Sequence, residues 1–127
     1  MHLSELQQRQ RAFDSQRGWA ENPFEVLFLY LAEEVGELSS SLQKIWKATD
    51  RLMDGQCEPR AARQEAMRLC TQEAGSEMAD CLLLLASLAN ATGVDLDAAV
   101  DAKLRRNEQR TWACDGRSKA DQLRAVL

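Results

Sequence analysis

The chain has 127 residues, a net charge of −4 and a hydrophobic fraction of 45%. This length suits one domain, so we expect a single helical domain over residues 1–127 with a polar tail from about residue 114. The acidic balance argues against a nucleic-acid polymer as partner. The N-terminal segment is polar, and the longest apolar run, Cys81 to Ala86, is too short to span a membrane. We therefore expect a cytoplasmic protein without a membrane partner.

The sequence predicts an all-α fold of the four-helix-bundle type. The first helix is expected from Ser4, as its N-cap, to about Arg17. The second is expected to open at Asn22-Pro23, with Asn22 as N-cap and Pro23 in the first helical position, and to run to about Met53. Its apolar residues recur with a period near 3.6: Phe24, Leu27, Phe28, Leu31, Val35, Leu38, Leu42 and Ile45.

A loop over residues 50–60 is expected to follow, because Gly55 and Pro59 lie in it. The third helix is expected from about residue 61 to 92, with a bend or an interruption at Gly75. From Glu77 onward it becomes nearly all apolar, which predicts a buried helix. The fourth is expected to start after Asp95 and to reach about Arg110, and a short last helix is expected near residues 119–126.

Two groups of acids, one of three residues and one of two, occur at helical spacing. Glu33, Glu34 and Glu37 fall on one arc of the second helix, beside its apolar stripe. Glu77 and Asp80 share a face of the third helix, where the chain becomes apolar. Acids that converge at a buried border repel one another, and a divalent cation relieves both the repulsion and the cost of burial. Oxygen ligands favour Mg²⁺, with Mn²⁺ as the alternative.

Two other interpretations of the acids stay open at this point. The three acids of the second helix taken alone suit a solvated surface. Structural salt bridges could also balance the cluster through the cations of the fourth helix, and residue chemistry alone weighs this evenly against a metal. Zinc and a histidine-containing di-iron site are set aside, because the one histidine is His2 and the four cysteines match no zinc spacing.

A polar face is expected on the fourth helix. Lys103, Asn107 and Arg110 lie at positions i, i+4 and i+7, so they can present a cation, an amide and a guanidinium together. Phosphate oxygens and a sugar hydroxyl suit these groups, although cations near a helix C-terminus are also favoured by the macrodipole. Trp46 is a candidate for stacking on a base, and core packing suits it equally well.

Three motifs in order resemble the MazG-like all-α nucleoside triphosphate pyrophosphohydrolases. They are Glu34-x-x-Glu37, Glu77-x-x-Asp80 and Lys103-x-x-x-Asn107-x-x-Arg110. The resemblance covers residues 4–112. It implies that Glu34, Glu37, Glu77 and Asp80 ligate Mg²⁺, that Glu33, Glu34 or Glu37 helps to deprotonate a water, and that the basic face binds substrate.

The resemblance also implies a reaction and an assembly. A nucleoside triphosphate would be cleaved to its monophosphate and pyrophosphate, as in enzymes that remove unwanted nucleotides. Members are oligomeric, so a homodimer or homotetramer is expected, with helices of each subunit contributing to a shared core. One alternative is a dUTP/dUDP- or dCTP-specific hydrolase of the same superfamily. Another is a non-catalytic helical oligomer whose acids hold a structural metal or partner charges.

Overall fold

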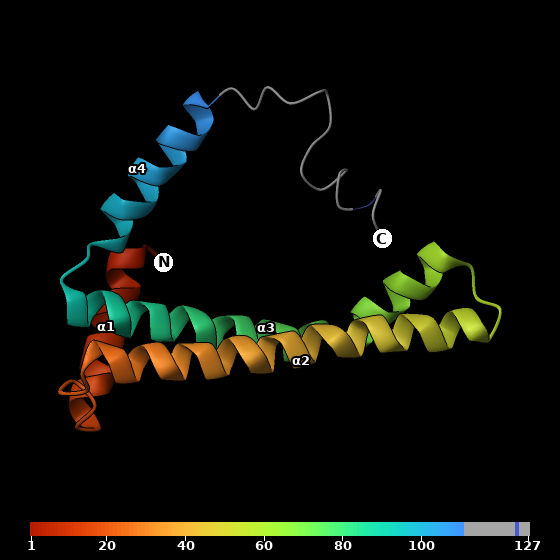
Figure 1. The fold of residues 1–127 in the computed structure, drawn as a ribbon, viewed down its shortest axis with the longest axis horizontal. Helices are drawn as coiled ribbons and strands as arrows, with labels where there is room; N and C mark the ends of the chain where they lie inside the picture. Colours follow the sequence, from red (N-terminus) through yellow and green to blue (C-terminus); the bar gives the residue numbers. More distant parts are fainter. Residues whose placement is uncertain (111–123, 125–127) are drawn as a thin grey trace. The chain divides into compact units, whose positions relative to one another are not determined.

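The structure is a computed structural model, and it describes residues 1–110 and residue 124. These residues form four helices and no strand: α1 (Leu3–Gln16), α2 (Phe24–Asp54), α3 (Pro59–Thr92) and α4 (Leu96–Gln109) (Figure 1). The all-α prediction is therefore confirmed. The chain divides into two compact units, Met1–Asp97 and Ala98–Leu127, and each is described by itself below. The helix predicted near residues 119–126 lies, apart from Arg124, outside the described residues.

Two long helices dominate the first unit. Figure 1 shows α2, drawn from orange to yellow-green, lying alongside α3, and α1 packs against α3 as well. The loop predicted over residues 50–60 is present but shorter, covering residues 55–58, because α2 continues to Asp54 and α3 begins at Pro59. Pro59 suits the first turn of a helix, and the Glu58 carboxylate caps α3 by accepting from the backbone N–H groups of Arg60 and Ala61 at 3.1 and 3.0 Å. The predicted interruption at Gly75 is wrong, since α3 is one continuous helix that ends at Gly93 in the left-handed conformation.

The predicted caps of the first two helices are wrong. α1 begins at Leu3 after His2, and α2 begins after Pro23, each without a side-chain cap. Instead, the Asp97 carboxylate accepts hydrogen bonds from the backbone N–H groups of Leu3 and Ser4, at 3.1 and 3.0 Å. The residue that caps α1 thus comes from the first turn of α4, more than 90 positions away in the sequence.

Removing this distant cap is expected to destabilise the first unit. Hydrogen bonds from Ser4 and then from the backbone of Leu3 lower the pKa of Asp97 below its ordinary value of 3.8. Its contribution to stability is therefore present above pH 3.8 and is lost as the pH falls through the lower, folded pKa. We expect Asp97→Ala to lower the Tm by a few degrees at pH 7 in thermal unfolding followed by circular dichroism. Asp101→Ala, which removes only an exposed ion pair with Arg105, is the control. Equal Tm values for wild type and Asp97→Ala at pH 7 would contradict this assignment.

The single chain buries few large side chains. Among the described residues, the buried apolar ones are Leu6, Leu27 and five alanines of α3, namely Ala62, Ala66, Ala74, Ala86 and Ala89. The apolar part of α3 is only partly covered, since Leu82 and Leu85 are 43% and 42% exposed. The prediction of a helix buried all round is therefore wrong for one chain. None of the described helices is by itself long and apolar enough to cross a membrane. The bent pair of α3 and α4, taken together, has the length and composition of a membrane span.

Candidate functional site

Three of the predicted acids converge between the two long helices. Glu34 comes from α2, whereas Glu77 and Asp80 lie one turn apart on α3. One carboxylate oxygen of each lies within 4.8 Å of the others. Because α2 and α3 run side by side, the two acidic motifs meet although more than 40 residues separate them in the chain. We call Glu34, Glu77 and Asp80 the acidic cluster.

The electrostatics of the acidic cluster fit a cation. Among the described residues, Glu34 Oε2 and Glu77 Oε2 are buried side-chain oxygens without a hydrogen-bond partner. Burial raises the pKa of both carboxyls, and repulsion from Glu37 and Asp80 raises it further. A buried oxygen without a partner is costly, and so is repulsion between like charges. A divalent cation removes both costs, and an all-oxygen donor set suits Mg²⁺ or Mn²⁺.

The described ion pairs leave the acidic cluster unbalanced. They join Lys44 to Glu73, Arg68 to Glu65 and Arg105 to Asp101, so they use other acids. None of these three pairs includes Glu34, Glu77 or Asp80, although the charge of Lys44 also interacts with that of Glu77. Salt bridges to the cations of α4, which lie in the second unit, stay a prediction.

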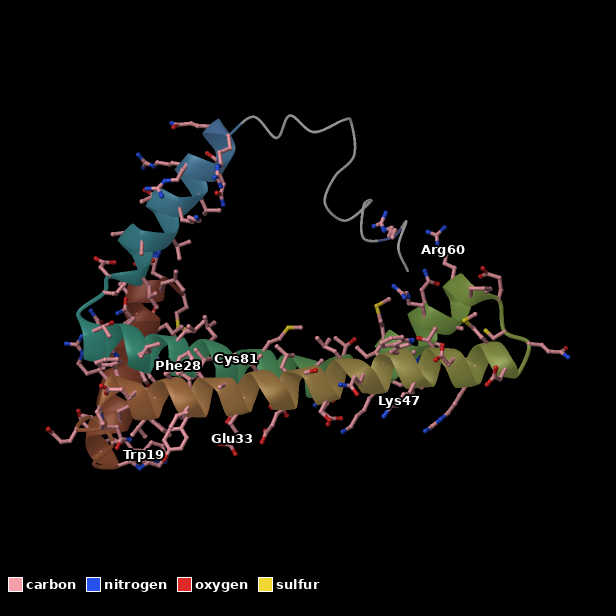
Figure 2. The ribbon with its side chains drawn as sticks, in the orientation of Figure 1. Trp19, Phe28, Glu33, Lys47, Arg60 and Cys81 are labelled. Atoms are coloured by element: carbon pink, nitrogen blue, oxygen red, sulfur yellow. The ribbon has the colours of Figure 1, made fainter. Side chains whose placement is uncertain are left out.

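The other two predicted acids lie at the edge of the cluster. Glu37 is exposed, one turn beyond Glu34, and its charge acts on both Glu34 and Glu77. Glu33 is exposed as well, and in Figure 2 its side chain projects from the edge of α2 that faces away from α3. Glu33 has the weakest effect of the named acids on the pKa of Glu34. Their roles as ligand and base stay predictions.

Cys81 follows the cluster on α3 (Figure 2). Its thiol is free and partly buried. Burial raises the pKa of Cys81, and the nearby Glu34 and Asp80 raise it further. Mg²⁺ and Mn²⁺ prefer oxygen ligands, so the carboxylates are the groups of this region that suit such a metal.

A cleft of about 790 Å³ opens beside the cluster, and Glu34 and Asp80 form part of its wall. Its remaining wall comes mainly from α1, with further residues of α2 and α3 and of the segment between α1 and α2. Three aromatic side chains, Phe13, Trp19 and Tyr30, lie in it. The Phe13 ring meets Trp19 edge to face, with centroids 5.8 Å apart. A cleft of this size, apolar with a few polar groups, can hold a small organic ligand whose charged end reaches the acids.

The sequence analysis missed this cleft. Phe13 and Trp19 belong to none of the motifs that the sequence offers. The available signal was their position on either side of Gly18, whose φ of +70° turns the chain back toward α2. This short segment is rich in aromatic and polar side chains. Its role becomes clear only when the residues of α2 and α3 that line the same cleft are known.

The remaining predicted residues belong to other parts of the chain. Trp46 is 69% exposed and lines a separate shallow groove on α2 with Val35 and Leu42, so it is not part of the acidic cluster. Lys103 and Asn107 lie on α4 in the second unit, which is described by itself, and Arg110 follows the helix end, its N–H donating to Asn107 O at 3.2 Å. The roles of these four residues stay predictions.

The raised pKa values predict how the metal-free protein responds to pH. Between the ordinary value of 4.5 and the raised folded pKa, Glu34 and Glu77 hold more protons in the folded than in the unfolded state. Stability is therefore lost as the pH rises through this window. We expect the Tm of the wild type in EDTA to fall relative to that of Glu34→Gln as the pH rises above 4.5. Stabilisation by Mg²⁺ should grow over the same range, because metal binding needs deprotonated carboxylates. A Tm difference between the two proteins that does not change with pH would contradict the raised pKa values.

The fold and the acids define a class of protein: an all-helical chain with a carboxylate cluster between two paired helices, beside a cleft for a small ligand. The family model of the MazG nucleotide pyrophosphohydrolase domain matches residues 22–114, and the chain belongs to this family. This membership supports hydrolase activity on nucleotides, and the family is generally dependent on divalent metals. The match includes both acidic motifs and α4, whereas α1 and Trp19 precede it. Neither the curated proteins nor the solved structures contained a match to this chain.

Proposed function

We propose that this protein is a Mg²⁺-dependent nucleoside triphosphate pyrophosphohydrolase, with Mn²⁺ as the alternative ion. The observation that carries the proposal is the acidic cluster. Its three oxygens lie within 4.8 Å of one another, and two of its members, Glu34 and Asp80, line the cleft. The family match supports the same class of reaction. Removal of unwanted nucleotides from the cytoplasmic pool is the role that this chemistry suits.

The residues of the site have separable tasks in this proposal. Glu34, Glu77 and Asp80 hold the cation, and Glu37 joins them or orients them through its charge. When bound, the cation supplies neutralisation of the triphosphate and a lower pKa for water. A carboxylate of the second helix, Glu33, Glu34 or Glu37, accepts the proton of the attacking water. Water attacks the α-phosphorus, the bond to the pyrophosphate oxygen breaks, and a nucleoside monophosphate remains.

The rest of the substrate is assigned to two surfaces. The cleft takes the nucleoside, with its base among Phe13, Trp19 and Tyr30, because aromatic faces stack on any base. Lys103, Asn107 and Arg110 bind phosphate or sugar oxygens, and Trp46 remains a candidate for a stacking contact in the assembled protein. A dUTP/dUDP- or dCTP-specific hydrolase is compatible with this arrangement.

A panel of nucleoside triphosphates with Mg²⁺ tests the proposal. We expect release of pyrophosphate, and not of phosphate, together with the matching monophosphate. Mg²⁺ should also raise the Tm, since a ligand at 100 times its Kd stabilises the folded state by about 2.7 kcal/mol. Stabilisation by Mg²⁺ without release of pyrophosphate from any nucleotide would instead favour the non-catalytic alternative with a structural metal. Release of phosphate alone would contradict the assigned bond cleavage.

We also propose that the protein is a homodimer or homotetramer. Large apolar side chains are exposed on the paired helices, and Phe24, Phe28, Leu29 and Leu88 line a groove there. Exposed apolar surface of this kind is typical of subunit interfaces. A second copy of the same chain would supply the cover that the apolar part of α3 lacks.

A further inference from the structure

A second group of polar side chains lies in the cleft, away from the acidic cluster. Asp14 and Gln10 of α1 and Ser87 of α3 all line the cleft wall. Asp14 and Ser87 are among its most buried members, with exposed fractions of 9% and 4%. None of the three belongs to the motifs that the sequence analysis assigned to function. We call them the Asp14 group.

The Asp14 group is a connected network. Ser87 Oγ donates to Asp14 Oδ2 at 2.7 Å, and Gln10 Nε2 donates to Asp14 Oδ1 at 3.1 Å. Gln10 Nε2 also lies 3.1 Å from Ser87 Oγ. A carboxylate has about four acceptor positions, so these two bonds leave Asp14 with capacity to accept from a ligand. The two donors fix the carboxylate in one orientation on the wall.

The position of Asp14 is unfavourable for a purely structural acid. It lies in the last turn of α1, where the helix macrodipole disfavours a negative charge. A neutral side chain would join α1 to α3 through Ser87 without that penalty. A buried carboxylate with spare acceptors, held against the macrodipole in a ligand-sized cleft, therefore indicates recognition of a hydrogen-bond donor.

The spacing along α3 relates the Asp14 group to the acidic cluster. Ser87 follows Asp80 by seven residues, so the two lie on the same face about 10 Å apart along the helix axis. A nucleotide whose phosphates reach Asp80 can extend its base along α3 toward Ser87. The aromatic residues Phe13 and Trp19, on the same cleft wall, would then face the ring while Asp14 meets its edge.

We propose that Asp14 is a specificity-determining residue that selects nucleobases carrying an exocyclic amino group. The carboxylate accepts from the amino N–H of cytosine, adenine or guanine. It repels the carbonyl oxygen that uracil presents in place of the cytosine amino group, and hypoxanthine in place of the adenine amino group. Ser87 and Gln10 are positioning residues that orient the carboxylate. This inference rests on the proposed hydrolysis of nucleoside triphosphates.

Pairs of substrates that differ in one amino group provide the test. For the wild type with Mg²⁺, we expect kcat/KM for pyrophosphate release to favour dCTP over dUTP, or dATP over dITP, by about 10- to 100-fold, as for a hydrogen bond to a charged group. Asp14→Asn offers an amide N–H that suits a carbonyl oxygen, so the preference should fall to near one or reverse. Glu5→Gln, at an exposed acid of the same helix, should leave the ratio unchanged.

The outcomes separate this inference from the proposed function. Equal kcat/KM values within both pairs for the wild type would overturn the inference and leave the pyrophosphohydrolase intact, and this comparison needs no folded variant. A preference that Asp14→Asn retains, while circular dichroism and stabilisation by Mg²⁺ match the wild type, would overturn the assignment to Asp14. Failure to release pyrophosphate from any triphosphate would instead overturn the proposed function.

Discussion

Glu34→Gln and Asp80→Asn are each expected to reduce kcat for pyrophosphate release by about 10²- to 10³-fold, the effect typical of losing one preorganised electrostatic group. Each substitution replaces one of the three carboxylates that converge within 4.8 Å by a neutral amide, and so removes a negative charge that balances a divalent cation. The fold should survive, because neutralising one acid also relieves the repulsion that raises the pKa of Glu34 and Glu77. In EDTA the Tm of each variant should therefore equal or exceed that of the wild type, while the increase in Tm caused by Mg²⁺ should be lost.

Asp50→Asn is the matched control for these two variants. Asp50 is an exposed acid of the same helix as Glu34, about 24 Å further along its axis. Its substitution should leave both turnover and the Mg²⁺-dependent rise in Tm unchanged. Full activity of both Glu34→Gln and Asp80→Asn would show that the metal and the reaction lie elsewhere on the protein.

Phe28→Glu is expected to convert the protein to a monomer. The Phe28 side chain is 58% exposed in the single chain and lines the apolar groove with Leu29 and Leu88 (Figure 2). A charge at the centre of a contact between subunits would be buried without a partner, which disfavours association strongly. Sedimentation velocity should show one species of monomer mass for Phe28→Glu and a dimer or tetramer for the wild type.

Phe28→Leu separates the effect of charge from that of shape. Leucine keeps an apolar side chain in the groove, so this variant should remain associated, with a modest increase in its dissociation constant. A wild type that sediments as a monomer at micromolar concentration would refute the assembly. Identical behaviour of Phe28→Glu and the wild type would place the interface on another surface.

Helix positions were largely predictable, because they depend on local periodicity. Apolar residues at a 3.6-residue period gave α2 and its end near Asp54, and Gly93 gave the end of α3. The errors lie at residues of a type that is common in two kinds of local structure. Pro59 occurs in loops as well as in the first turn of a helix, and here the Glu58 cap selects the helix. The cap of α1 is supplied by Asp97, and no local pattern encodes a contact between residues so distant in the sequence.

The acidic cluster was predictable because its members occur in pairs at helical spacing on two apolar helices. Pairing alone left the salt-bridge alternative open, and only the packed structure shows which acids the cations contact. The cleft was not predictable in the same way. Its walls combine α1 with the middle of α3, so residues such as Asp14 and Ser87 acquire meaning only once the helices pack. Residues whose role depends on packing against a distant helix produce no periodic pattern in the sequence.

The alanines buried on α3 act as spacers for the acidic cluster. The distance between two packed helices depends on the side chains at their contact, and small residues allow the closest approach. Ala62 and Ala66 are completely buried, and Ala74 lies one turn before Glu77. A larger side chain at Ala74 would push α3 outward and draw Glu77 away from Glu34, without touching a single acid. The geometry of the acidic cluster therefore depends on residues that carry no chemistry, and the proposed binding of a cation would limit the size of the side chains that these positions tolerate.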